Sequence, residues 1–174
     1  MLKPETDRLR PLHVGERWIG PRHNFDGLLS FAQYDKSCYS YLQLFRNGSV
    51  EMVNTSLLIR NERENRTPEL YIDDRYEQHV VEGVGNILSL QKELGVEPPL
   101  FVMLSFLRVR DYVVAFSGTH PSGEGHPIDQ NDLLLPEEVI ETFDSDVESI
   151  MQRSYQIVWN AAGYSHPPQR RDRR

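Results

Sequence analysis

The residues best suited to chemistry lie in one long loop, residues 118–132, that is rich in glycine, proline and histidine. His120, His126 and Asp129 offer imidazole nitrogens and a carboxylate, which are donors that zinc binds in proteins. Because these donors are spread through a glycine-rich loop, their spacing fixes no coordination geometry. A small metal-dependent hydrolase that uses this loop is therefore an alternative interpretation, beside a surface loop in which His-Pro steps enforce extended backbone.

Signatures of nucleophilic catalysis and of nucleotide binding are missing from the sequence. No Gly-x-Ser-x-Gly elbow, P-loop or Gly-x-Gly-x-x-Gly turn follows a predicted strand. The single cysteine, Cys38, lies between two predicted strands, where we interpret it as a buried or half-buried small hydrophobic residue. The sequence therefore favours a chain without catalytic residues and predicts no cofactor.

One patch in the body of the chain combines basic and aromatic side chains, Arg108, Arg110 and Tyr112. The formal net charge of −7 opposes a broad phosphate-binding surface. The segment 169–174 holds four arginines and one aspartate, and we expect it to be disordered. Weak nucleic-acid binding through Arg108, Arg110 and this tail is a second alternative.

Several aromatic side chains are predicted to be exposed on a sheet face that no helix covers. Tyr39, Tyr41 and Tyr112 would suit contact with a partner or ligand there, because aromatic side chains dominate the energetics of interfaces. The full set of candidate ligand- or partner-binding residues is Tyr39, Tyr41, Arg108, Arg110, Tyr112 and His126.

Strand patterns lie on both sides of one predicted helix. Residues 25–31, 39–45 and 50–59 favour strands, and Asn47-Gly48 predicts a type I′ turn because both residues tolerate positive φ. The apolar run of residues 100–109 predicts a central strand buried on both faces. We expect an antiparallel partner over 112–116, and further strand structure near 139–143.

Two helices are predicted from apolar spacings of three and four residues. The first begins after Pro68 and ends at Gly95. The second begins at a capping box, Ser145 to Glu148, and ends at Gly163. The order βββαβββα predicts an α+β fold, a mostly antiparallel sheet of about six strands with two amphipathic helices packed on it.

The length of 174 residues fits a single domain. We expect that domain to cover residues 25–164, after a flexible N-terminal arm (1–24) and before a disordered basic tail (165–174). No apolar run approaches the ~20 residues of a membrane-spanning helix, and the charged N-terminus does not resemble a secretory signal. A cytoplasmic location without membrane contact is the expectation.

Three stretches resemble a known family. They are Phe25-Asp26-Gly27 with residues 41–51, residues 94–105, and residues 126–137 with Trp159-Asn160. Together they resemble the C-terminal region of bacterial DNA-binding proteins that carry an AlbA_2 (Schlafen-type) domain upstream. The AlbA_2 module itself is missing here, so no catalytic residue transfers to this sequence.

The resemblance implies a non-catalytic accessory domain of a bacterial DNA-binding or defence-type system. Such a domain would sense a ligand or mediate assembly, with a protein partner or a second copy of itself. Nucleic acid would be contacted only through an upstream or partner AlbA_2-type module.

Overall fold

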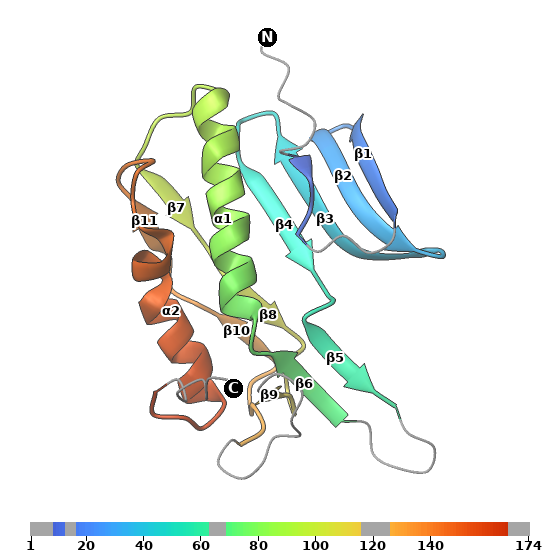
Figure 1. Ribbon diagram of the computed structural model, residues 1–174, viewed down its shortest axis with the longest axis vertical. Coiled ribbons are helices and arrows are strands. Elements are labelled where there is room, and N and C mark those ends of the chain that lie inside the picture. The colour runs from blue at the N-terminus through green and yellow to red at the C-terminus, as the bar shows by residue number, and fades with distance from the viewer. Residues whose placement is uncertain (1–8, 13–16, 63–68, 116–125, 167–174) are drawn as a thin grey trace, which may run out of the picture.

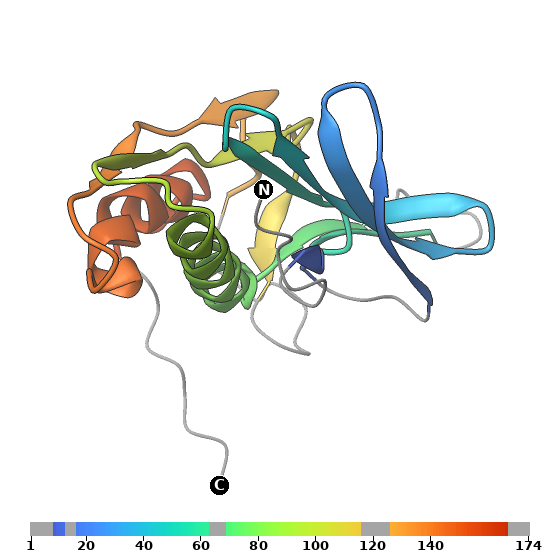
Figure 2. The same cartoon turned by 90° about the horizontal axis from the view of Figure 1, so that it is seen from above.

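Two helices lie side by side on one side of the molecule, and strands from both halves of the chain lie behind and beside them (Figures 1 and 2). The computed structural model describes residues 9–12, 17–62, 69–115 and 126–166. Over these residues the fold is α+β with mostly antiparallel sheets, which confirms the predicted class. The described residues form eleven strands in four sheets, more than the roughly six expected.

The N-terminal half forms a four-stranded antiparallel sheet in the order β1-β2-β3-β4. Its strands are β1 (Arg17–His23), β2 (Gly27–Tyr34), β3 (Ser37–Phe45) and β4 (Val50–Asn54). Residues 17–23, which we expected in a flexible arm, thus form an edge strand. Pro21 is tolerated there because it falls in a register irregularity between Ile19 and Arg22.

The hairpin between β3 and β4 is present as predicted, but its turn differs from the predicted type. The N–H of Gly48 donates to the carbonyl of Phe45 at 3.1 Å, and the N–H of Phe45 donates to the carbonyl of Ser49 at 2.9 Å. Gly48 has φ of +88°, whereas Asn47 is not among the residues with positive φ. A three-residue loop of this kind needs only one left-handed residue, so the prediction of a type I′ turn is wrong.

A second sheet joins the middle of the chain to a later strand. It contains β5 (Leu58–Asn61), β6 (Glu69–Asp73) and β9 (Val113–Ala115), in the order β5-β6-β9. Residues 69–73 were expected to begin a helix and instead form β6. β9, which we expected to pair with residues 100–109, pairs instead with β6, and this pairing is parallel. Residues 100–107 pair with two later strands of the chain.

Two antiparallel strand pairs run end to end along the C-terminal half. They are β7 (Leu100–Val102) with β11 (Glu138–Ile140), and β8 (Ser105–Leu107) with β10 (Asp132–Leu134). We call these four strands the ribbon. The ribbon lies behind the helices in Figure 1 and above them in Figure 2.

The helices are α1 (Tyr76–Glu93) and α2 (Val147–Ala161). Asp146, rather than the predicted Ser145, is the N-cap of α2, and its side chain accepts a hydrogen bond from the N–H of Glu148. Gly163, with φ of +84°, follows α2 as expected for a left-handed helix stop. Among the described residues, no helix is long and apolar enough to cross a membrane.

The larger core lies between the helices, the ribbon and the β5-β6-β9 sheet. Its fully buried side chains come from several of these elements, and include Ile72, Tyr76, Val114, Ile140 and Val158. A smaller core joins the four-stranded sheet to α1, with Leu42 and Leu44 of β3 packed with Leu90 of α1. The cores together hold the ribbon and the four-stranded sheet on α1.

Two glycine-to-alanine changes are expected to act on stability in opposite directions. Gly27 has φ of +152°, and an added Cβ would lie 2.1 Å from the carbonyl oxygen of Leu44. Gly27→Ala should therefore lower the free energy of unfolding by about 2–3 kcal/mol. Gly85 lies in α1 with open space around its Cα, so Gly85→Ala should raise it by about 0.5–1 kcal/mol.

Chemical denaturation of the two variants tests this pair. A Gly27→Ala variant that is as stable as the wild type would contradict the backbone geometry of the hairpin between β2 and β3.

Candidate interaction surface

Five of the eight exposed large apolar side chains among the described residues lie on the outward face of the ribbon. These side chains are Phe101 (59% exposed), Met103 (73%), Leu107 (57%), Leu134 (74%) and Val139 (38%). Four of them lie in the strands of the ribbon, and Met103 lies between β7 and β8. They are therefore grouped on one part of the molecule and not scattered singly over its surface. Contiguous apolar surface of this kind marks interaction sites.

The strand register places these side chains on the same side. Phe101 pairs with Val139, and both are exposed, whereas their neighbours Leu100 and Ile140 pair with each other on the inward side. Further along the ribbon, residues 103, 105 and 107 are exposed, whereas Phe106 between them is buried. Because side chains alternate between the faces of a strand, one face is in the core and the other is outward.

The expectation that residues 100–109 form a strand buried on both faces is therefore wrong. The run is apolar at both alternating sets of positions, and the inward set alone packs on the core. Within the described part of the chain, nothing packs over the outward set.

An aromatic cluster below the ribbon fixes it to both helices. The ring of Tyr76 on α1 lies 5.4 Å from that of Phe106 on β8 and 5.9 Å from that of Tyr155 on α2, both edge-to-face. The indole Nε1 of Trp159 donates a hydrogen bond to Glu77 Oε1 at 2.6 Å. Burial raises the pKa of Tyr76 and of Tyr155 well above the usual range, so both hydroxyls remain protonated donors.

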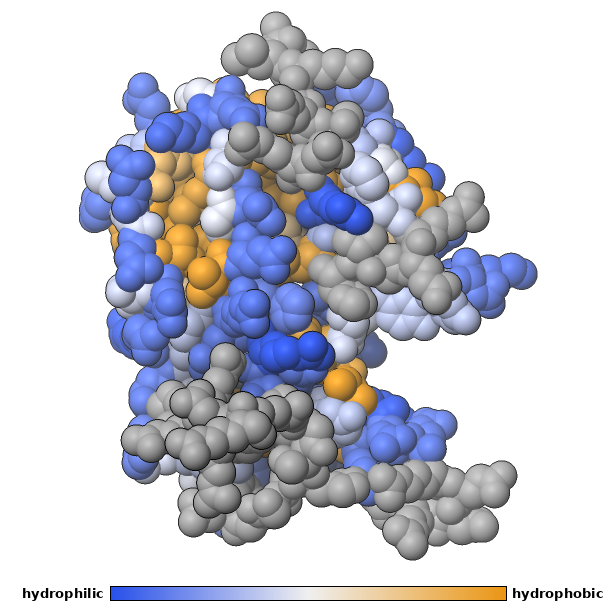
Figure 3. Space-filling view, in the orientation of Figure 1, coloured by the Kyte–Doolittle hydropathy of each residue, from blue (hydrophilic) through white to orange (hydrophobic). Residues whose placement is uncertain are grey.

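The helix side of the molecule also shows apolar surface, between α1 and α2 (Figure 3). The apolar side chains of these helices include Val80, Val84 and Ile150, which are half-buried and already packed against the larger core. This surface is therefore the edge of a filled interface and differs from the outward face of the ribbon.

The four-stranded sheet has a second face, opposite α1, that no helix of the described residues covers. Cross-strand pairing aligns Ile19, Phe31, Tyr41 and Val53 in one row across all four strands. Each is half-buried, and none belongs to either core cluster. The guanidinium of Arg22 lies 4.7 Å from the centre of the Phe31 ring, a cation–π contact that covers part of the row.

Tyr41 provides a test of this second face. Its hydroxyl donates a hydrogen bond to Glu51 Oε1 at 2.6 Å, and this bond raises the pKa of Tyr41 from 10.0 to about 12. Because the folded-state pKa exceeds the unfolded one, the associated stabilisation is complete below pH 10 and is lost as the pH rises towards 12. NMR titration of the Tyr41 ring should show Glu51→Gln moving the midpoint towards 10, with Glu62→Gln as the neutral control.

If the Tyr41 midpoint is the same in wild type and Glu51→Gln, the hydrogen bond across β3 and β4 does not form in solution.

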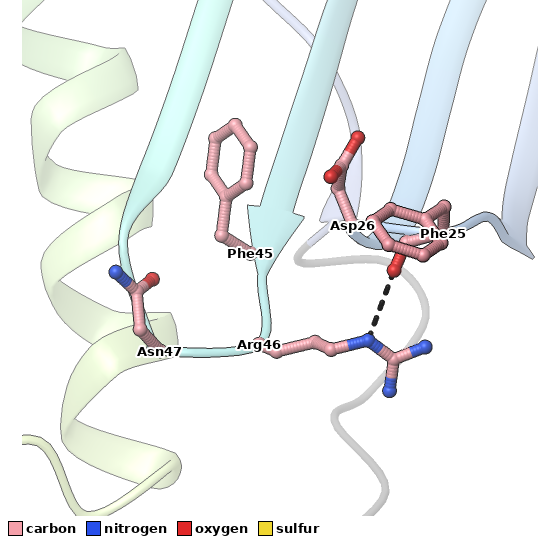
Figure 4. Close-up of a pocket in the computed structure, with 5 residues that line it drawn as sticks. All are labelled: Phe25, Asp26, Phe45, Arg46 and Asn47. Atoms are coloured by element: carbon pink, nitrogen blue, oxygen red, sulfur yellow. Dashed lines mark hydrogen bonds between the residues drawn. The ribbon is translucent and has the colours of Figure 1, made fainter.

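A shallow depression lies beside the β3–β4 turn (Figure 4). It is lined by Phe25, Asp26, Phe45, Arg46 and Asn47, and Arg46 Nε donates a hydrogen bond to the carbonyl of Phe25 at 3.0 Å. Four of these five residues are exposed. Such an open depression does not enclose a small molecule as a ligand pocket does.

The candidate residues predicted from the sequence do not form one site. Tyr39 and Tyr41 share β3, where Tyr39 is 38% exposed and Tyr41 is half-buried. Arg108 and Arg110 are exposed in the turn after β8, which lies well below β3 in Figure 1. The N–H of Arg108 donates to Asp132 Oδ1 at 2.8 Å and lowers the pKa of Asp132.

The remaining two candidates are Tyr112, which packs against the larger core, and His126, which is exposed. Tyr112 is half-buried and packs against the larger core, so it is not the exposed aromatic that we expected. His126 is exposed, and its N–H donates to the carbonyl of Ala162 at 2.9 Å, which places it at the end of α2. Cys38, predicted to be buried, is exposed.

The metal-binding alternative falls partly outside the described residues. His120 lies there, whereas His126 and Asp129 are described and exposed. Among the residues that the structure describes, no group of three or more His, Cys, Asp and Glu side chains is arranged to hold a metal ion.

Sequence reasoning missed the five outward side chains of the ribbon. A partial signal lies in Asp132, Glu137 and Glu141, whose charge indicates a solvent-facing side of this stretch, and the structure leaves Leu134 and Val139 exposed together with them. In an antiparallel pair one face of both strands packs on the core and the other faces solvent. Charged residues on one strand therefore indicate that the same face of its apolar partner strand is also exposed.

No protein family model, characterised protein or solved structure matches this chain. The resemblance to proteins with an AlbA_2 domain therefore stays a prediction.

Proposed function

We propose that this chain is a non-catalytic accessory domain for protein assembly, and that the outward face of the ribbon is its docking surface. The observation that carries the proposal is the set of five large apolar side chains, 38% to 74% exposed, on one face of the two strand pairs of the ribbon. Burying a large apolar side chain contributes about 1.5–3 kcal/mol, so a partner that covers this face gains substantial free energy.

The occupant that we propose is a different protein and not a second copy of this chain. Asp132, Glu137 and Glu141 are exposed on the same face as the apolar side chains. A two-fold dimer through this face would bring two sets of carboxylates together, and like charges in an interface are unfavourable.

The sequence resemblance supports a setting for this interaction. In that setting the domain acts beside an AlbA_2-type module in a bacterial DNA-binding or defence-type system in the cytoplasm. The module contacts nucleic acid and this domain contacts protein. The net charge of −7 supports the same division of roles, because an acidic surface repels phosphate.

Face-specific capture tests the proposal. Wild-type chain, Met103→Asp/Leu134→Asp and Gln78→Asp/Asn86→Asp are immobilised and exposed to lysate of the cells that express the chain. The proposal expects one protein to be captured by the wild type and by the α1 variant, but not by the ribbon variant. After purification, that protein should again bind the wild type and the α1 variant and not the ribbon variant. Equal capture by all three, or a wild-type dimer that Met103→Asp/Leu134→Asp dissociates, would overturn it.

A further inference from the structure

Carboxylates and apolar side chains are interspersed along β10 and β11 on the docking face. From residue 132 to residue 141, the outward positions are Asp132, Leu134, Glu137, Val139 and Glu141, all exposed. The segment of β7 and β8 presents Phe101, Met103, Ser105 and Leu107 beside them. The docking face is thus largely apolar on the side of β7 and β8, and mixed acidic and apolar on the side of β10 and β11.

These carboxylates belong to a longer acidic segment. Residues 126–152 contain eight Asp and Glu residues and no Lys or Arg. In the described part of the chain the ion pairs join Arg60 to Glu62 and Arg75 to Asp73, so none of the eight is ion-paired there. Along the chain this segment is bordered by Arg110 and Arg153, and the hydrogen bond to Asp132 comes from the backbone N–H of Arg108.

An apolar face whose acidic border has no ion-pair partner among the described residues selects its partner by charge. We infer that the partner's docking segment is a cationic amphipathic polypeptide in which Lys or Arg side chains alternate with apolar ones. This inference rests on the proposed function. The apolar side chains of the segment cover Met103 and Leu134, and its cations lie against Glu137 and Glu141.

Two physical reasons favour such a segment. Successive outward side chains on a strand are about 6.4–6.8 Å apart, which is also the spacing of alternate side chains in an extended peptide. Complementary charge raises the rate of association and suppresses wrong partners, whereas the apolar contacts provide the affinity.

Three synthetic peptides of about ten residues, long enough to cross the ribbon, test the inference. Each alternates Leu with Lys, with Gln or with Glu, and carries a fluorescent label for anisotropy measurements with the full chain. The inference expects the Leu–Lys peptide to bind at least about 10-fold more tightly than the Leu–Glu peptide, with a difference that shrinks at high salt.

Two matched variants locate the effect on the protein. Glu137→Gln/Glu141→Gln should weaken binding of the Leu–Lys peptide by about 5–10-fold, because each rim charge contributes a few-fold. Glu62→Gln/Glu82→Gln removes the same charge from exposed positions after β5 and on α1, and should change the affinity for the Leu–Lys peptide by less than about 2-fold.

The outcomes separate the inference from the proposed function. Equal binding of the Lys and Glu peptides, or equal weakening by the two charge variants, overturns the inference. If all three peptides still bind and Met103→Asp/Leu134→Asp abolishes that binding, the docking surface is supported although the charge selection fails. If none of the peptides binds, both fail.

Discussion

Replacing Tyr76 by alanine is expected to lower the free energy of unfolding by about 3–5 kcal/mol, the range for removing a large buried aromatic side chain. Tyr76 is completely buried, and its ring contacts Phe106, Tyr155 and Trp159 at centroid distances of 5.4, 5.9 and 6.4 Å. The change removes the side chain that joins α1, α2 and the ribbon, and leaves a cavity lined by the other three rings.

Chemical denaturation measures this loss, and two further variants control it. Tyr34 is 55% exposed, so Tyr34→Ala should change stability by less than about 0.5 kcal/mol. Tyr76→Phe keeps the ring and loses only the 3.3 Å hydrogen bond to Glu77, at a cost of about 1 kcal/mol. A Tyr76→Ala variant within about 1 kcal/mol of wild type would show that the cluster does not fix the ribbon.

The second large effect concerns binding. Met103→Asp/Leu134→Asp should weaken partner binding by at least about 100-fold, because two central apolar contacts are lost and two charges would be buried. Stability should change by less than about 1 kcal/mol, since the side chains are 73% and 74% exposed and contribute little to the core.

The matched control is Gln78→Asp/Asn86→Asp, which adds the same charge at exposed positions of α1. Its partner affinity should stay within about 2-fold of wild type, because these residues lie on the helix side. Isothermal titration with the purified partner measures all three affinities. Equal losses in both variants would mean that added charge, and not the ribbon face, weakens the complex.

The elements that the sequence predicted well are those whose signal is local. The hairpin of β3 and β4 follows from alternation around Gly48, and α2 follows from a cap and an apolar face that ends at Gly163. Both are specified by residues within about 20 positions of each other, the range in which periodicity is informative.

The elements that escaped prediction depend on distant parts of the chain. β6 is only five residues long and directly precedes α1, so its apolar residues merge with the helical pattern. Its pairing with β9 is parallel and joins residues 71–73 to residues 113–115, which no local pattern encodes. β1 contains Gly20 and Pro21, residues that argue against a strand except at an irregular edge.

The candidate surface was hidden for a related reason. An apolar run such as residues 100–107 indicates burial, but it does not say whether the chain itself or a partner covers the second face. The binding residues that we predicted from their residue types lie on separate elements: Tyr39 and Tyr41 on β3, and Arg108 and Arg110 after β8. They are apart because β3 and β8 belong to different sheets.

Hydrogen–deuterium exchange of the chain, alone and bound to its partner, tests the docking surface most directly. The complex should show slower exchange over residues 100–107 and 132–141, and unchanged exchange over residues 37–54 of the four-stranded sheet. Protection of residues 37–54 with none on the ribbon would contradict the proposal and place the partner on the row of Phe31 and Tyr41 instead.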